Sequence, residues 1–333
     1  MASSGERPLV AVVGGDTLLA REIRDLLGQA KPEPRVQLIS AAAGASTLLA
    51  AEEDETVVMT PLNAESLEGS AAAFLAGSPA SSRRTLKIIP AGGPVLIDLG
   101  GALEEQPNAR LRAPSAEPPG SRPVSSTIYI IAHPAAIALS MFFSNLAKAG
   151  AIRQSVAHVF EPASERGQRG LDELQQQTVA VLNFQKLKMD VFDAQLGFNV
   201  LARYGEEALE PLEGIEQRLE RHLATLLAAW PGVPMPSLRL IQAPVFHGHS
   251  ISVWVEFEEN PGTDAISRAL EEGGLDVRKE EPPSNAGMAG QSGLSVGAIA
   301  VDSNHARACW FWVVADNLRL AAENAVAVAK ELL

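Results

Sequence analysis

Short apolar runs alternate with segments of helical spacing along the first third of the chain. Pro8–Val13 is an apolar run that ends at Gly14-Gly15-Asp16, and apolar residues then recur at intervals of three and four as far as Leu27. An apolar run, a tight turn and an amphipathic segment are typical of a strand, a turn and a helix. This pattern predicts the opening unit of a doubly wound α/β domain.

Further apolar runs predict more strands, which we expect in Val36–Ser40, Val57–Met59, Leu86–Ile89 and Val95–Leu99. Ala-rich stretches between the runs, such as Glu65–Ala76, predict helices. Glu104–Val124 is rich in Pro, Glu and Arg, which indicates a surface loop before a domain boundary.

The second half of the chain combines β patterns with amphipathic helical patterns. Thr127–Ala132 predicts a strand, and Pro134–Leu146 predicts a helix whose first turn suits Pro134. Pro282–Ser295 is rich in Gly, Ser and Pro, so we expect it to be mobile. The remaining expected strands are Ser155–Phe160, Leu238–Phe246, His249–Phe257 and Trp310–Val314, and the remaining expected helices are Leu171–Leu182, Ile215–Leu227 and Asn317–Leu333.

Length and composition indicate a globular protein with an acidic surface. A chain of 333 residues suggests two domains. The 27 basic and 40 acidic side chains give a formal charge of −13, which would repel phosphate backbones, so we expect no nucleic-acid partner. The N-terminus lacks the pattern of a secretion signal, and the most apolar window, Ile128–Gly150, contains polar side chains. We therefore expect no membrane span and a cytoplasmic protein.

The turn after the first predicted strand is the first candidate for ligand binding. Dinucleotide-binding turns use glycines where the backbone approaches the pyrophosphate. Gly14, Thr17 and Ala20 keep the spacing, but the Thr17 side chain stands where phosphates would press against the backbone. Two interpretations stay open: an ordinary turn between strand and helix, and a weakened nucleotide site.

Four further residues, in three segments of the chain, carry reactive side chains. His133 stands at the start of a predicted helix, where a capping or core role competes with acid/base chemistry. His247 and His249 would point the same way on a strand, but no nearby histidine or cysteine completes a metal site, so we expect none. Cys309 is the only cysteine, and its apolar strand predicts a small hydrophobic role.

Several motifs, in the same order, resemble the aspartate-semialdehyde dehydrogenase family across nearly the whole chain. Val314–Ala322 resembles its V-A-D-N-L-R-K-G-A-A motif, and Pro244–Ser250 resembles its P-V-F-x-G-H-S motif. Val95–Asp98 resembles its V-I-D strand end, and Ile130–Ala136 resembles its I-I-A-N-P-N-C motif. Gln242–His249 also resembles the cysteine-less Usg-type paralogues of this family.

The resemblance implies an α/β fold of two domains. A Rossmann-like, doubly wound domain of NAD(P)-binding type would comprise residues 1–127 and 313–333, with the C-terminal helix returning to it. Residues 128–312 would form an α+β domain of dimerisation or substrate type, and the chain would be a homodimer. The family reduces an aspartyl phosphate with NADPH through a cysteine thioester, with a histidine as acid/base and arginines that hold the anionic groups.

When the family motifs are compared with this sequence position by position, the acid/base histidine corresponds to His249, and most of the other functional groups are replaced. The nucleophile position is Ala136, preceded by Ala135 in place of Asn, and the substrate arginine is Gln242. Glu104 stands for the arginine of the phosphate segment. Ser40–Gly44 lacks the arginine of the adenosine-phosphate segment, and Leu320 replaces a lysine. The positions implied for the cofactor are Gly14, Asp16, Thr17, Leu18, Leu19 and Asn317, and Asp316 and Glu210 are also kept.

These replacements argue against the family reaction. Without a thiol no acyl-enzyme forms, and Gln or Glu in place of Arg removes bidentate anion recognition. We expect a catalytically inactive or repurposed member whose ligand or protein partner is unidentified. Two alternatives are an NAD(P)-dependent oxidoreductase that uses His249, and an aspartate-semialdehyde dehydrogenase with a non-covalent route. NADP as cofactor is implied by resemblance alone.

Overall fold

The computed structural model describes residues 7–42, 48–52, 55–90, 92–121 and 125–333. The chain forms two compact units. The first comprises Met1–Pro114, Pro119–Ala132 and Ala321–Leu333, and the second comprises Ser115–Pro118 and His133–Leu320. The chain therefore returns to the first unit within its last helix.

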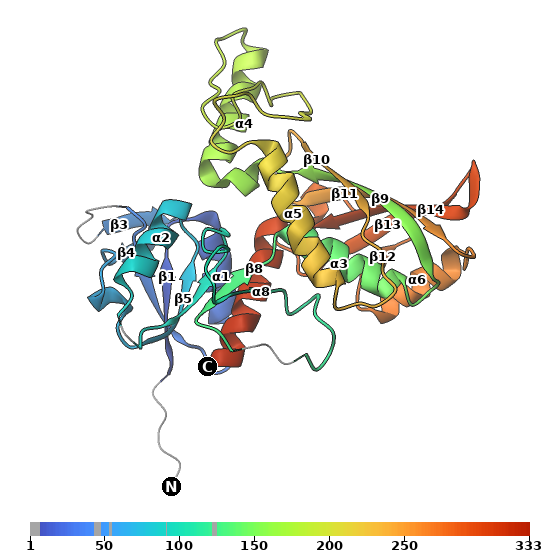
Figure 1. The fold of residues 1–333 in the computed structure, drawn as a ribbon. Helices are drawn as coiled ribbons and strands as arrows, with labels where there is room; N and C mark the ends of the chain where they lie inside the picture. The colour runs from blue at the N-terminus through green and yellow to red at the C-terminus, as the bar shows by residue number, and fades with distance from the viewer. Residues whose placement is uncertain (1–6, 43–47, 53–54, 91, 122–124) are drawn as a thin grey trace. The chain divides into compact units, whose positions relative to one another are not determined.

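A six-stranded sheet, parallel throughout, forms the centre of the first unit (Figure 1). Its order is β2 (Arg35–Ile39), β1 (Leu9–Val13), β5 (Ser70–Leu75), β6 (Val95–Asp98), β8 (Ile128–Ile131) and β7 (Ala109–Arg112). The central strands β1 and β5 are almost entirely buried, as expected for a parallel sheet covered on both faces.

The helices of the first unit are α1 (Leu18–Gly28), α2 (Pro79–Ile88) and residues 321–332 of α8 (Asn317–Leu332). Thr17 caps α1, and Ser78 caps α2. The buried guanidinium of Arg112 donates to both carboxylate oxygens of Glu331 at 3.0 Å, which ties the end of α8 to β7. The α/β class, the doubly wound first unit and the returning C-terminal helix predicted from the sequence are confirmed.

Two predictions for the first unit are wrong in the type of element. Glu65–Ala76 is not a helix but the short 3-10 helix η1 (Glu65–Leu67) followed by β5. Pairing with β1 on one side and β6 on the other outweighs the helix preference of its alanines. Leu86–Ile89 is not a strand, because Ser78 and Pro79 begin a helix upstream and Leu86 belongs to its inward side.

Two further predictions need partial correction. Val57–Met59 lies in β4 (Glu55–Met59), which pairs with β3 (Leu48–Glu52) outside the main sheet, and Val58 is exposed rather than buried. Glu104–Val124 contains the edge strand β7, although residues 122–124 lie outside the described part. Arginines at alternate positions of β7 hide its strand character from a search for apolar runs.

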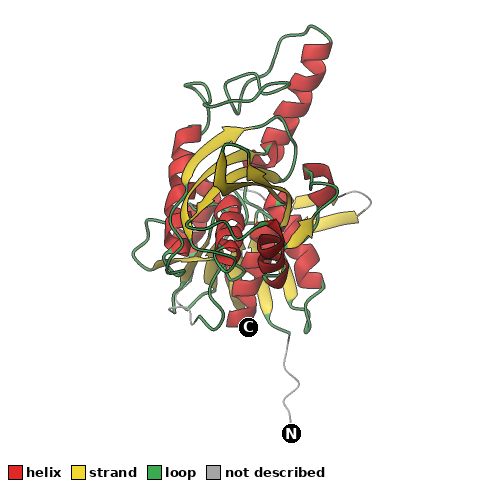
Figure 2. Ribbon diagram, turned by 90° about the vertical axis from the view of Figure 1, so that its right-hand side faces the viewer, coloured by secondary structure: helices red, strands yellow, loops and turns green. Residues whose placement is uncertain are grey.

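The second unit contains a six-stranded mixed sheet (Figure 2). Its order is β10 (Ser237–Gln242), β9 (Ile152–Glu161), β11 (His249–Phe257), β14 (His305–Ala315), β13 (Ser295–Asp302) and β12 (Asp276–Arg278). Its helices are α3 (Pro134–Leu146), α4 (Gly167–Leu182), α5 (Leu212–Leu227), α6 (Thr263–Glu272), α7 (Asn285–Met288) and the 3-10 helix η2 (Ala163–Arg166). None of the described helices combines the length and apolar character needed to cross a bilayer.

The predicted helices and strands of the second unit each overlap an observed element of the same type, and α3 matches its prediction at both ends. The predicted strand Leu238–Phe246 stops at Gln242. Pro282–Ser295, expected to be mobile, contains the short helix α7, which Ser284 caps. Helix α6 and strands β12 and β13 were not predicted.

One face of the mixed sheet is buried, and the opposite face is partly accessible. On β9, Ala157 and Val159 are fully buried. The alternate residues Val156, His158 and Phe160 point the other way and are half-buried. The strand register continues this second face across β11 and β14. We call it the open sheet face, and it consists of Val156, His158, Phe160, Ser252, Trp254, Trp310 and Trp312.

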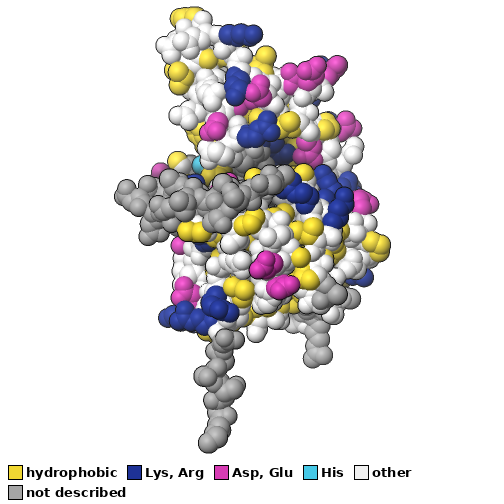
Figure 3. Space-filling view, turned by 90° about the vertical axis from the view of Figure 1, so that its left-hand side faces the viewer, with side chains coloured by type: hydrophobic (Ala, Val, Ile, Leu, Met, Phe, Trp, Pro, Cys, Tyr) yellow, Lys and Arg dark blue, Asp and Glu magenta, His cyan; other side chains and the backbone are white. Residues whose placement is uncertain are grey.

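Helix α4 and residues 183–211 form an arm at the top of Figures 1 and 3. Buried Glu173 accepts hydrogen bonds from the backbone N–H groups of Val191 and Phe192 at 2.7 and 3.2 Å. Buried Gln177 bonds to four backbone groups in residues 188–197. These two side chains organise a long segment without regular structure. Its surface mixes charged with exposed apolar side chains (Figure 3), the latter being Val179, Leu182, Phe184, Met189, Phe198, Val200 and Leu209.

Asp98 is a fully buried carboxylate at the end of β6. It accepts hydrogen bonds from the N–H groups of Leu103 and Gly100 at 2.8 and 3.1 Å. Burial raises the pKa of Asp98 from 3.8 to about 6, although these hydrogen bonds oppose the rise.

The raised pKa of Asp98 predicts a pH-dependent stability. Between about pH 4 and about pH 6 the folded state binds this proton more tightly than the unfolded state, so the free energy of unfolding falls as the pH rises, by about 3 kcal/mol in total. Asp98→Asn removes this contribution, whereas Asp172→Asn, which changes an exposed carboxylate, keeps it. Denaturant unfolding of the three proteins across this range measures the difference. Equal pH slopes for the wild type and Asp98→Asn would contradict the assignment.

Candidate functional site

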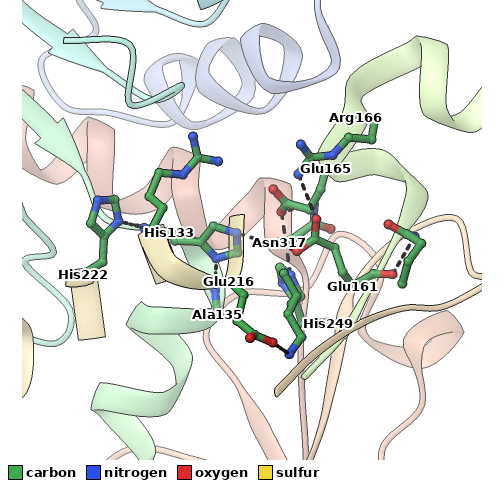
Figure 4. Close-up of polar contacts among 12 residues, drawn as sticks. His133, Ala135, Glu161, Glu165, Arg166, Glu216, His222, His249 and Asn317 are labelled. Atoms are coloured by element: carbon green, nitrogen blue, oxygen red, sulfur yellow. Dashed lines mark hydrogen bonds and ion pairs between the residues drawn. The ribbon is translucent and has the colours of Figure 1, made fainter. Parts of the chain in front are cut away.

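The N-terminus of α3 places His133 at the centre of a cluster of buried polar groups in the second unit (Figure 4). Its Nδ1 accepts from the N–H of Ala135 at 3.2 Å and so caps the helix, one of the roles that the sequence left open. Its own backbone N–H donates to Nδ1 of His222 on α5 at 2.9 Å. Ala135 and Ala136, in the first turn, are fully buried.

Glu161, the last residue of β9, is fully buried beside His133. One carboxylate oxygen accepts from Nη2 of Arg166 at 2.8 Å, and the other lies 3.8 Å from Nε2 of His133. Arg166 also donates from Nη1 to Glu210 at 3.0 Å, and Arg218 lies 3.7 Å from the other oxygen of Glu210. Arg166 is therefore paired with two carboxylates.

His249, the first residue of β11, is buried with its ring centre 5.6 Å from that of His133. Its Nε2 lies 4.0 Å from a carboxylate oxygen of Glu165. Asn317, at the start of α8, donates to this same oxygen at 2.8 Å and accepts from the N–H of Gly248 at 3.0 Å and the hydroxyl of Ser164 at 3.1 Å. Asn317 thereby links Gly248, which precedes His249 in the chain, to Ser164 and Glu165 of the segment 163–166 (Figure 4).

Gln242, the last residue of β10, is a buried structural residue of the same region. Its amide N–H groups donate to the backbone carbonyls of Glu161 and Ala243 at 2.9 and 3.1 Å. Its carbonyl accepts from the hydroxyl of Tyr204 at 2.5 Å, and burial raises the pKa of Tyr204, which keeps the hydroxyl protonated.

Burial dominates the titration of these groups. It lowers the pKa of His133 well below 6.5, and the neighbouring His249 lowers it further. Burial also lowers the pKa of His249, although Glu165 opposes this. For Glu161, burial raises the pKa to about 7, and Arg166 limits the rise. Two neutral imidazoles and a carboxyl group in one buried cluster are suited to proton exchange or to binding a cation.

The predicted nucleotide-binding turn between β1 and α1 lies in the first unit. The hydroxyl of Thr17 lies 2.9 and 3.1 Å from the carbonyls of Gly14 and Ala76, and it accepts from the N–H of Ala20 at 3.2 Å. Gly14 has φ +85°, and a Cβ there would lie 2.6 Å from Cα of Gly77. Local structure therefore accounts for both residues. The other residues implied for the cofactor in this turn are Asp16, which is exposed, and Leu18 and Leu19, which are half-buried.

Three more predicted positions have a clear structural setting. Cys309 is fully buried in β14, and burial raises the pKa of its thiol. His247 precedes β11, so the same-face argument for His247 and His249 does not hold. Glu104 lies in the loop after β6 in the first unit, and Ala43 and Gly44 of the segment Ser40–Gly44 lie outside the described residues.

Sequence reasoning missed the two residues that organise the cluster, Glu161 and Arg166. The signal for Glu161 is a charged side chain that ends an alternating apolar strand, because such a position becomes buried when the strand is central. No local pattern shows that Glu161 meets His133 and His249, since these residues come from three different elements.

Comparison with known proteins agrees with the motifs. Residues 144–320 match the family model described as "Semialdehyde dehydrogenase, dimerisation domain". The USG-1 protein homolog of Pseudomonas aeruginosa is 29% identical over 97% of both chains, and that of Azotobacter vinelandii is 30% identical over 78% of both chains. A solved structure, described as a probable aspartate-semialdehyde dehydrogenase from Pseudomonas aeruginosa, superposes with a TM-score of 0.83 at 27% identity and 98% coverage of both chains. The chain therefore belongs to the aspartate-semialdehyde dehydrogenase family.

Proposed function

We propose that this chain is a family member that does not carry out thioester chemistry and is catalytically inactive or repurposed. The supporting observation is the first turn of α3, where the position that the resemblance assigns to the nucleophile is the fully buried Ala136. A methyl group forms no acyl-enzyme, and the thiol of Cys309 is buried in a strand.

Two side chains of the described second unit that could hold an anionic substrate, Gln242 and Arg166, already bind protein partners. Gln242, at the position of the substrate arginine, uses its amide to bind three protein partners. Arg166 is a cation of the same cluster, but Glu161 and Glu210 occupy its Nη2 and Nη1 groups. A substrate carboxylate or phosphate would have to displace a buried ion pair, which is costly.

The residues implied for NADP fit a structural role better than a nucleotide site. NADP, if bound, would accept or donate a hydride. Between Gly14 and Leu19 the one charged side chain is the carboxylate of Asp16, which would repel a pyrophosphate, and the hydroxyl of Thr17 is engaged within the turn. The amide of Asn317 is likewise committed to Gly248 and Glu165.

A second function, an NAD(P)-dependent oxidoreductase that uses His249 as acid/base, is favoured by one observation. The guanidinium of Arg84 on α2 donates to the carbonyl of Ala41, just after β2. An arginine beside the end of the second strand is suited to the adenosine phosphate of NADP. Saturable micromolar binding of NADPH that Arg84→Ala abolishes would favour this function.

We also propose that the chain forms a homodimer through the open sheet face. This face carries three of the four tryptophans of the chain, Trp254, Trp310 and Trp312, and lies within the residues that match the dimerisation-domain model. Trp310 is 40% exposed. A partly accessible aromatic sheet face is stabilised when a second copy covers it.

The first prediction concerns the missing thiol. Neither the wild type nor Ala136→Cys will produce NADPH from aspartate semialdehyde, phosphate and NADP, because the groups that hold the anions are absent as well. Loss of a nucleophile alone costs on the order of 10⁶ in kcat in a covalent enzyme. NADPH absorbance measures the rate, and Ala135→Cys, a thiol in the same helical turn, is the matched control. Turnover by the wild type, or by Ala136→Cys and not by Ala135→Cys, would refute the proposal.

The proposed dimer can be tested at its centre. The wild type will sediment as a dimer, and Trp310→Glu will weaken dimerisation by about 2 kcal/mol or more, because a charge replaces an aromatic side chain that the second copy would bury. Leu182→Glu, which alters an exposed apolar residue of the arm, will leave the dimer intact. Sedimentation velocity at several concentrations distinguishes the three cases. A monomeric wild type, or dissociation by Leu182→Glu alone, would contradict the proposed surface.

A further inference from the structure

Three potential metal ligands meet in the buried cluster of the second unit. Nitrogen atoms of His133 and His249 and a carboxylate oxygen of Glu161 all lie within 4.8 Å of one another. The three side chains are 5% exposed or less. They come from the start of α3, the end of β9 and the start of β11.

The facing atoms of these side chains lack hydrogen-bond partners among the described residues. They are Nε2 of His133, Oε2 of Glu161, and both Nδ1 and Nε2 of His249. Buried polar atoms are nearly always satisfied, and an unpaired group indicates an ion or a water molecule at the site. Four such atoms in one cluster therefore point to a bound species.

Carboxylates outnumber guanidinium groups around the cluster. The carboxylates of Glu161, Glu165 and Glu210 stand against the guanidinium groups of Arg166 and Arg218, and these five groups leave one negative charge in excess when all are ionised. Arg166 pairs with Oε1 of Glu161 and leaves Oε2 facing His133.

We propose that His133, Glu161 and His249 bind one divalent transition-metal ion, with zinc as the best match. Two imidazoles and one carboxylate form a common zinc donor set, with a water molecule as the fourth ligand. This site goes beyond the proposed function and does not depend on it, because metal content is measured without any assay of turnover.

The geometry requires a small contraction of the cluster. The centre of an equilateral triangle with sides of 4.8 Å lies about 2.8 Å from each corner, whereas zinc lies about 2.0–2.2 Å from nitrogen and oxygen ligands. Side-chain rotations supply this difference. A metal bound to Nε2 of neutral His133 leaves the ring proton on Nδ1. Nδ1 can then no longer accept the hydrogen bond from the N–H of Ala135. That bond is 3.2 Å, at the long end of the usual range.

Metal analysis of the full-length protein tests the proposal. Untagged protein, equilibrated with zinc and then dialysed, will retain one zinc ion per chain by mass spectrometry. His249→Ala will bind zinc at least about tenfold more weakly in calorimetric titrations. His249 is the best residue to replace, because its ring nitrogens make no hydrogen bond within the described chain. His247→Ala, two residues away and outside the cluster, is the matched control and will bind as the wild type does.

Two further measurements keep the test decisive. Far-UV circular dichroism checks that His249→Ala is folded, and Glu161→Gln provides a second variant that must also weaken binding. Cobalt(II) absorption reports whether imidazole and carboxylate ligands surround the ion. A wild type that retains no zinc, consistent with a water molecule in the cluster, would overturn the proposal. Equal zinc affinity in His249→Ala and the wild type would overturn it as well.

Discussion

The second unit depends on how the buried carboxyl group of Glu161 is compensated. A charged group removed from water is strongly destabilising unless another group balances it, and here Arg166 does so from η2, a few residues along the chain. The same arginine reaches Glu210, and Gln242 binds the backbone carbonyl of Glu161. One ion pair thus links the end of β9 to the arm, to β10 and to the start of α3. Both terminal nitrogens of Arg166 are consequently engaged by carboxylates in the described structure.

The cluster occupies the place where the family resemblance puts thiol chemistry. The N-terminus of α3 presents Ala135 and Ala136, and its cap is an imidazole. The resemblance assigns His249 to the family acid/base, and its neighbours in the structure are His133, Glu161 and Glu165. Some polar groups of the cluster are paired with one another, whereas four buried atoms of His133, Glu161 and His249 have no hydrogen-bond partner in the described structure. A site of this kind is better suited to a cation or a proton than to an acyl phosphate.

Much of the fold could be predicted from the sequence, because hydrophobic periodicity and helix caps are local signals. Pro134–Leu146 is correct at both ends, since Pro134 and an apolar stretch define it. Prediction failed where tertiary pairing decides: β5 is an alanine-rich strand because it lies between β1 and β6. The predicted site contained His249 from motif resemblance. Its neighbour Glu161 was missed, because only the sheet brings β9 beside β11.

A double-mutant cycle on Glu161 and Arg166 tests the central claim, that this pair is committed to structure. The free energy of unfolding is measured for the wild type, Glu161→Gln, Arg166→Met and the double variant. We expect each single variant to lose about 3–5 kcal/mol, because it leaves one buried group without its partner, and the double variant to lose much less than the sum. Additive losses of about 1 kcal/mol or less would contradict the claim and would leave Arg166 available to bind an anionic substrate.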